Sequence, residues 1–255
     1  MTLTGANLSL WTIGQNQPKR ADHRHRESEI LAIDAEVPSG GSAPETKGGP
    51  TSTTLILVRH AKTPTTGTIL PGRAAGLSIS EDGLVQAKAI SASLAQVESI
   101  SAIYSSPLER ARETAEPLAL ARGLEVLADE RLIECDFGDW TGRRLDELSK
   151  LPEWKAVQGA PSKFRFPQGE SFREMSERMI NFLDWVHLTH RGECIAAFSH
   201  ADPIKALVAH CLGIHLDSFQ RVVISTTGLS AISITDTANY ALFVNLTPTP
   251  NLKVT

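Results

Sequence analysis

The feature that most constrains the fold is a set of short apolar runs that alternate with amphipathic helical patterns. The runs "TLILVRH" (Thr54–His60) and "ECIAAFSH" (Glu193–His200) are apolar at consecutive positions, not at every second one. A strand with this pattern is buried on both faces, which is typical of a parallel sheet covered by helices. We therefore predict an α/β fold: one three-layer α/β/α domain with a mostly parallel central sheet.

The remaining elements follow from the same patterns and from local capping signals. Ser80 is predicted to cap one helix, Ser106 with Pro107 to open a second, and Gly123 to end it. Ser171 and Glu174 form the sequence of a capping box at the start of a long helix. Further strands are predicted at 100–106, 124–129, 221–226, 229–236 and 240–246, and helices at 80–97, 106–123, 169–192 and 201–213.

The first 52 residues differ in composition from the rest. They hold a charge cluster, "KRADHRHRESE", and a Pro/Gly/Ser-rich stretch, "PSGGSAPETKGGPTST". We expect residues 1–52 to be a disordered extension and linker, with at most a short helix at 26–36, and residues 53–255 to be the folded domain. The first residues, "MTLTGANLSLWTIG", lack the basic start and apolar region of a secretory signal.

Charge and cysteine content exclude several functions. The formal net charge is −4 and no basic stripe is present, so nucleic acid is not an expected partner. No apolar run approaches the ~20 residues that a membrane span needs. Cys135, Cys194 and Cys211 are far apart and odd in number. They are typical of buried thiols in a reducing compartment, and we predict a cytoplasmic protein.

Two of the predicted buried strands end in histidine, at His60 and His200. Ligands of open α/β sheets bind outside the carboxyl ends of the strands, so both imidazoles are expected at one crevice if these strands are neighbours. Arg59 precedes His60 directly. Arg110 lies on the first turn of the helix that follows another strand, and Arg112 is turned about 200° away from it. Arg59, His60, Arg110, His200 and the helix N-terminus together predict a pocket for a phosphate-like dianion.

The ordered blocks "LVRHAKT", "GRAAGLSISEDGLVQAKAISASL", "AIYSSPLERARETAEPLA", "LIECDFGDWTG", "PQGESF" and "FSHADPIKAL" resemble the histidine phosphatase superfamily. The resemblance is to its phosphoglycerate-mutase-like branch and covers about 54–246. The middle blocks are similar to an actinobacterial subgroup labelled as phosphomutases or phosphatases. The fold implied is the phosphoglycerate-mutase-like form of the α/β/α domain.

The resemblance implies a role for each matching residue. His60 matches the phosphorylated nucleophile, and Arg59, Arg110 and His200 match the groups that hold the phosphoryl group. Glu134 matches the acid that protonates the leaving oxygen, with Asp136 and Asp139 as rival acids that the sequence leaves open. No metal and no other cofactor is implied.

The chain departs from the family's usual substrate-side residues. Ala61 replaces a glycine, Lys62 an acidic or polar residue, and Ala201 another glycine, while Thr66 stands where an asparagine is usual. We expect Thr66, Arg73 and Ala201 to contact substrate. These departures put the identity of the substrate in doubt and leave the catalytic groups intact.

The predicted activity is metal-independent phosphoryl transfer through phosphohistidine, with hydrolysis of a small phosphorylated metabolite as the first choice. Only 66 positions (200 − 134) separate Glu134 from His200, with one helix-length segment between them, and mutases carry a longer insertion there. We therefore expect a relatively open site, which favours water as the acceptor of the phosphoryl group from His60. The alternatives are a phosphoglycerate-mutase-type phosphomutase and a non-catalytic phospho-ligand module. The oligomeric state is not readable from the sequence.

Overall fold

The computed structural model describes residues 52–247. Residues 1–51 and 248–255 lie outside the described part. The predicted N-terminal extension, with its linker and short helix, therefore stays a prediction.

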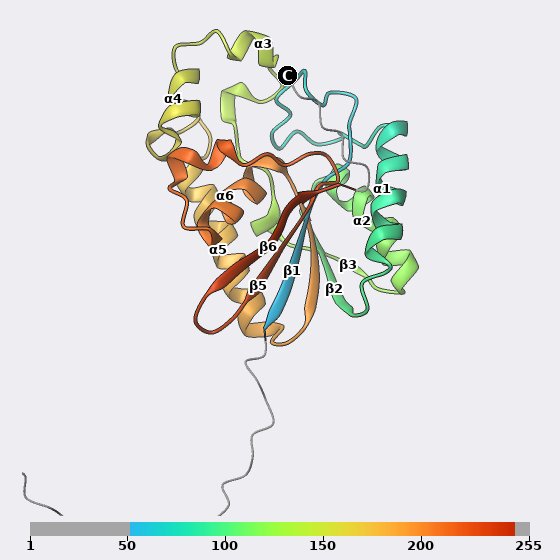
Figure 1. The fold of residues 1–255 in the computed structure, drawn as a ribbon. Coiled ribbons are helices and arrows are strands. Elements are labelled where there is room, and N and C mark those ends of the chain that lie inside the picture. The colour runs from blue at the N-terminus through green and yellow to red at the C-terminus, as the bar shows by residue number, and fades with distance from the viewer. Residues whose placement is uncertain (1–51, 248–255) are drawn as a thin grey trace, which may run out of the picture. The chain divides into compact units, whose positions relative to one another are not determined.

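A six-stranded sheet forms the centre of the described domain (Figure 1). Its order is β3-β2-β4-β1-β5-β6. The first four strands are parallel to one another, β5 pairs antiparallel with β1, and β6 pairs antiparallel with β5. This confirms the predicted mostly parallel sheet. The strands are β1 (Thr53–Arg59), β2 (Ile100–Ser105), β3 (Val126–Ala128), β4 (Cys194–Ser199), β5 (Leu229–Ile234) and β6 (Asn239–Leu246).

Successive residues of β1 pack against opposite layers of helices, which explains its continuous apolar run. Leu55 and Leu57 belong to a core cluster with α5 and α6, whereas Ile56 and Val58 belong to a cluster with α1 and α2. Figure 1 shows the two helix pairs on either side of the sheet, so the predicted α/β/α layering is confirmed. The helices are α1 (Glu81–Leu94), α2 (Glu109–Arg122), α5 (Phe172–Thr189) and α6 (Ala201–Cys211).

A third hydrophobic cluster covers the carboxyl end of the sheet. It is built on aromatic side chains, and the indoles of Trp140 and Trp154 stack with centroids 6.1 Å apart. The short helices α3 (Leu145–Leu148) and α4 (Trp154–Gly159) lie at this end in Figure 1. Short 3₁₀ helices complete the fold at η1 (Glu130–Leu132), η2 (Gly138–Trp140), η3 (Pro161–Lys163) and η4 (Leu216–Arg221).

Most of the capping residues and sequence patterns predicted the helix or strand that the structure shows, but two predictions were wrong. The capping box of Ser171 and Glu174 is formed, and Gly123 ends α2 in the left-handed conformation with φ 64°. However, α2 begins at Glu109, and the residue before it, Leu108, gives no side-chain cap. The hydroxyl of Ser106 accepts from the N–H of Leu108 at 3.3 Å and lies 2.8 Å from Nε2 of His200. No helix of the described residues is long and apolar enough to cross a membrane.

The second error is the strand predicted at 221–226. Its β-branched residues follow η4 as an irregular segment, because β4 and β5 already occupy both edges of β1. The side chain of Ile224 is buried, and its carbonyl oxygen accepts a hydrogen bond from Arg59 Nη1 at 2.7 Å. This segment therefore supports the end of β1 from the side instead of adding a strand.

Candidate active site

The two strand-end histidines lie side by side. β1 and β4 are parallel neighbours, and their register sets Arg59 opposite Ser199. His60 and His200, the next residue on each chain segment, consequently meet at the carboxyl edge with ring centroids 5.1 Å apart. Both are buried, with 5% and 0% of their surface exposed.

The imidazole of His60 is held in a form that can act as a nucleophile. Its Nδ1 lies 2.7 Å from the carbonyl oxygen of Ala61, so Nδ1–H donates there and the lone pair remains on Nε2. Burial, together with the positive charges of Arg110 and Arg59, lowers the pKa of His60 to about 3. The ring is therefore neutral throughout the physiological pH range.

Two arginines reach the same place from different elements. Arg110 is fully buried on the first turn of α2, and its Nη2 donates to the carbonyl oxygen of Gly72 at 2.7 Å. Arg59 is anchored by Nη1 on Ile224. Arg112, two residues along α2, is exposed. Helical spacing thus turns one arginine toward the crevice and the other toward solvent.

Several buried donors at this crevice have no hydrogen-bond partner among the described residues. They are Nε of Arg59, Nε and Nη1 of Arg110, and Nδ1 of His200. His200 is oriented by Ser106, whose Oγ lies 2.8 Å from its Nε2. Burial, followed by the charge of Arg110, lowers the pKa of His200 well below its usual value. Unpaired buried donors cost free energy unless an acceptor reaches them, and the oxygens of a phosphoryl group are such acceptors.

Glu134 lies beside these groups on the loop that follows η1. Its carboxylate is 7% exposed, and Oε1 accepts a hydrogen bond from the backbone N–H of Cys135 at 2.9 Å. Burial raises the pKa of Glu134 to about 7, with a further contribution from the negative charge of Asp202. A substantial fraction of Glu134 is therefore protonated near neutral pH. The rival acids lie farther out: Asp139 is exposed, and the Asp136 side chain is 41% exposed.

Arg59, His60 and Glu134 line one pocket of about 310 Å³. Of the three expected substrate contacts, Thr66 and Ala201 also line it. Arg73 is not among the lining residues. Its guanidinium instead contacts the carbonyl oxygen of Glu134 at 2.8 Å and a carboxylate oxygen of Glu170 at 3.0 Å.

Sequence reasoning missed a polar group on the wall of this pocket. Lys205 Nζ lies 3.0 Å from Asp202 Oδ1 and 2.9 Å from Gln220 Oε1, and all three residues line the pocket. Asp202 and Lys205 stand three residues apart on the first turns of α6, directly after His200, and that spacing was a usable signal. The pocket also has apolar lining residues, and α3 and α4 supply Leu145, Trp154 and Val157.

The sequence profile of one protein family, described as the histidine phosphatase superfamily (branch 1), matches residues 55–247. The chain belongs to the histidine phosphatase superfamily. This confirms the resemblance on which the expected roles rest. The superfamily match spans every element of the described sheet, from β1 to β6.

Relatives within the superfamily are phosphatases or phosphoglycerate mutases. Phosphoserine phosphatase 1 of Hydrogenobacter thermophilus is 35% identical over 198 residues, which cover 76% of this chain and 92% of the relative. Probable phosphoglycerate mutase GpmB of Cronobacter sakazakii is 33% identical over 181 residues, 70% of this chain and 83% of the relative. A crystal structure of phosphoserine phosphatase from Entamoeba histolytica in complex with 3-phosphoglyceric acid superposes with a TM-score of 0.69 at 25% identity. It covers 77% of this chain and 98% of that one.

Proposed function

We propose that this protein is a metal-independent phosphomonoesterase that transfers a phosphoryl group from a small phosphorylated metabolite to His60 and then to water. The observation that carries the proposal is the convergence on one pocket of a neutral imidazole (His60), an arginine with an unpartnered Nε (Arg59) and a protonatable carboxyl (Glu134). Phosphoryl transfer requires an in-line nucleophile, stabilisation of the equatorial oxygens and an acid for the leaving group.

In the first step, the Nε2 lone pair of His60 attacks phosphorus and the bond from phosphorus to the ester oxygen breaks. Glu134 gives its proton to the departing alkoxide, which is otherwise a poor leaving group. The guanidinium groups of Arg59 and Arg110, together with His200, donate hydrogen bonds to the non-bridging oxygens. The products of this step are the free alcohol and a phosphohistidine.

In the second step, the Glu134 carboxylate removes a proton from a water molecule that attacks the phosphohistidine. The P–Nε2 bond breaks, its electron pair returns to His60, and inorganic phosphate leaves. Glu134 is protonated again, so the cycle closes. A carboxyl pKa near neutrality serves both halves of the cycle, because the group must give a proton and then take one.

For the substrate, we propose a phosphorylated amino acid such as phosphoserine. Two observations support this class: the 35% identical relative is named a phosphoserine phosphatase, and Asp202 and Lys205 offer one charge of each sign to the pocket. An α-ammonium would bind Asp202 and an α-carboxylate would bind Lys205. A substrate with only negative groups, such as phosphoglycerate, could bind Lys205 but would offer no cationic group to Asp202.

Phosphomutase activity is the second candidate, favoured by the relative named as a phosphoglycerate mutase and by the wall that α3 and α4 supply to the pocket. A mutase returns the phosphoryl group to the substrate alcohol and depends on a bisphosphorylated primer. The third alternative, a non-catalytic phospho-ligand module, predicts the loss of the nucleophile or the acid. Both His60 and Glu134 are present and line the pocket, which supports an enzyme over this alternative.

The decisive experiment measures phosphate release from phosphoserine and 4-nitrophenyl phosphate in EDTA, together with trapping of acid-labile, base-stable phosphohistidine. His60→Ala should abolish both turnover and trapping. His210→Ala, at an exposed position on α6, is the matched control and should retain both. Turnover that survives His60→Ala would refute the mechanism. Interconversion of 2- and 3-phosphoglycerate faster than hydrolysis of either would establish the mutase instead.

A further inference from the structure

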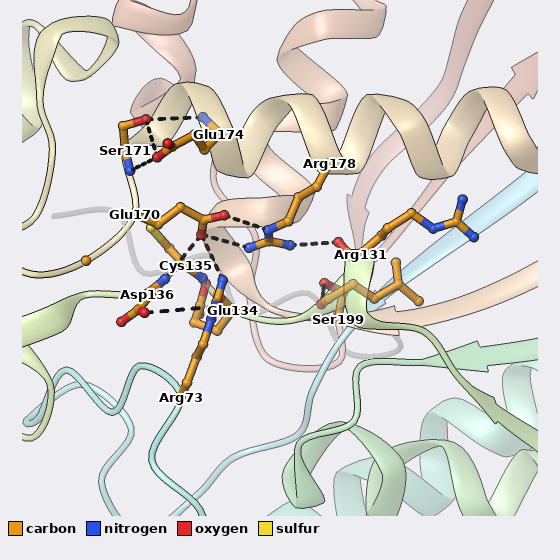
Figure 2. Close-up of polar contacts among 12 residues, drawn as sticks. Arg73, Arg131, Glu134, Cys135, Asp136, Glu170, Ser171, Glu174, Arg178 and Ser199 are labelled. Carbon is orange, nitrogen blue, oxygen red and sulfur yellow. Dashed lines mark hydrogen bonds and ion pairs between the residues drawn. The ribbon is translucent and has the colours of Figure 1, made fainter.

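Beside the pocket, a partly buried carboxylate is held between two arginines. Glu170 receives Arg73 Nη2 at 3.0 Å on Oε2 and Arg178 Nε at 2.9 Å on Oε1, and its side chain is only 12% exposed. Figure 2 shows the three side chains meeting from three segments: the loop of Arg73, the loop before α5, and α5 itself. We call Arg73, Glu170 and Arg178 the acid-loop clamp.

Each member of the acid-loop clamp also binds the backbone of the segment that carries Glu134. Arg73 Nε donates to the carbonyl oxygen of Glu134 at 2.8 Å. Glu170 Oε2 accepts from the N–H of Asp136 at 3.2 Å, and Arg178 Nη1 donates to the carbonyl oxygen of Arg131 at 2.7 Å (Figure 2). The clamp thus fixes this loop on both sides of the acid and at the acid's own peptide group.

The same loop is pressed against the turn that carries Glu170. The backbone N–H of Glu170 donates to the carbonyl oxygen of Asp136 at 2.8 Å. A Cβ built on Gly169 would lie 2.4 Å from that same oxygen, and one on Gly138 would lie 2.0 Å from the carbonyl oxygen of Pro167. Two glycines are therefore needed for the backbones to approach so closely. The loop that carries Glu134 and the turn that carries Glu170 are therefore in direct backbone contact.

Stability alone does not account for a buried arrangement of this kind. The desolvation of a buried ion pair roughly cancels its Coulombic attraction, and apolar residues of similar size often serve as well. The planar guanidinium group of an arginine does fix the direction of each hydrogen bond that it donates. General acid catalysis depends on such placement, because the acid must stand within hydrogen-bond reach of one leaving oxygen.

We propose that Arg73, Glu170 and Arg178 are positioning residues that hold the carboxyl of Glu134 against the leaving-group oxygen. This inference rests on the acid role of Glu134 in the proposed function. It assigns Arg73 to the orientation of the acid and not to direct contact with substrate. None of the three is among the residues that line the pocket.

The test compares two substrates whose leaving groups need the acid to different degrees. Phosphoserine releases an alkoxide and needs a proton donor, whereas 4-nitrophenyl phosphate releases a stable phenolate and needs little help. Glu170→Gln keeps the shape of the side chain and removes its charge. It should lower kcat/KM at least about 10-fold for phosphoserine and less than about 3-fold for 4-nitrophenyl phosphate, because general acid catalysis supplies roughly 100-fold or more for poor leaving groups.

Glu174→Gln is the matched control. Glu174 stands four residues away at the start of α5, pairs with Arg165, and has a side chain that is 48% exposed. This variant should leave both substrates unchanged. Equal losses on the two substrates in Glu170→Gln would overturn the inference, since that pattern reports general structural damage. If Glu170→Gln does not fold, Arg178→Lys replaces it, with the same expected split between substrates.

Glu134→Gln separates failure of the inference from failure of the proposed function. If the acid role is correct, Glu134→Gln loses far more activity on phosphoserine than on 4-nitrophenyl phosphate. If Glu134→Gln shows this split and Glu170→Gln does not, only the positioning role is wrong. If Glu134→Gln shows no split, the acid assignment itself is wrong and the inference fails with it.

Discussion

Replacing the proposed acid should make the protein more stable at alkaline pH while it disables catalysis. Burial raises the pKa of Glu134 from its ordinary value of 4.5 to about 7 in the folded protein. A carboxyl whose pKa is higher in the folded protein than in the unfolded chain destabilises the folded protein when it is ionised. As the pH rises above the unfolded value, the unfolded chain ionises freely while the folded protein resists, so stability is lost. Glu134→Gln removes this loss because the amide does not ionise.

The size of the effect follows from the two pKa values. With 4.5 unfolded and about 7 folded, linkage gives a penalty of about 1 kcal/mol at about pH 5.5 and about 3 kcal/mol at about pH 8. The difference, about 2 kcal/mol, is the amount by which wild type should weaken relative to Glu134→Gln between these conditions. The amide oxygen of Gln can still accept from the N–H of Cys135, so that hydrogen bond is retained.

The measurement is urea unfolding of both proteins at about pH 5.5 and about pH 8, taken as a double difference so that the titrating groups that do not interact with Glu134 cancel. Asp139→Asn, an exposed carboxyl on the same loop, is the control for the general effect of losing a negative charge. A double difference of zero, or one that favours wild type at high pH, would refute the raised pKa of Glu134.

Four further outcomes are expected. Arg110→Met should lower kcat/KM about 100-fold or more on every substrate, measured by phosphate release, because it removes donors to the transferring group. Its urea midpoint should be equal or higher, because an uncompensated buried charge is removed. Lys205→Met should raise KM for phosphoserine with little change for 4-nitrophenyl phosphate in steady-state kinetics. The kcat/KM for phosphoserine should fall as pH rises through about 7, since Glu134 then loses its proton. Gly138→Ala should cost ~2 kcal/mol or more in thermal unfolding, because its φ is +50° and the new Cβ would meet Pro167.

The two histidines at adjacent strand ends are the part of the site that could be predicted from the sequence. His60 and His200 each close an apolar run, and the topological rule for parallel sheets brings such positions together. Glu134 lies on an irregular loop with no periodic signal, so only the family resemblance pointed to it. Helical spacing could have predicted Asp202 and Lys205 as site residues, because they follow His200 on α6.

Long-range contacts explain most of what sequence could not provide. Arg73 and Glu170 are 97 residues apart, and their meeting depends on how the loop and α5 pack after the sheet has formed. The strand predicted at 221–226 failed for a related reason. Its β-branched residues suit a strand, but a strand also needs a free neighbouring edge, and β1 has none to offer.

The pairing of β1 with β4 has a consequence for how this enzyme can change. The two histidines meet only in the register that sets Arg59 opposite Ser199, and both strands lie in the interior of the sheet. Such strands open only with the whole domain, so the reacting geometry should persist on heating until global unfolding. The walls of the pocket come from α3, α4 and the start of α6, outside that paired core. Substitutions in these walls can change which phosphorylated alcohol is bound while the reacting groups keep their positions. The same reaction centre can therefore serve different substrates in the course of evolution.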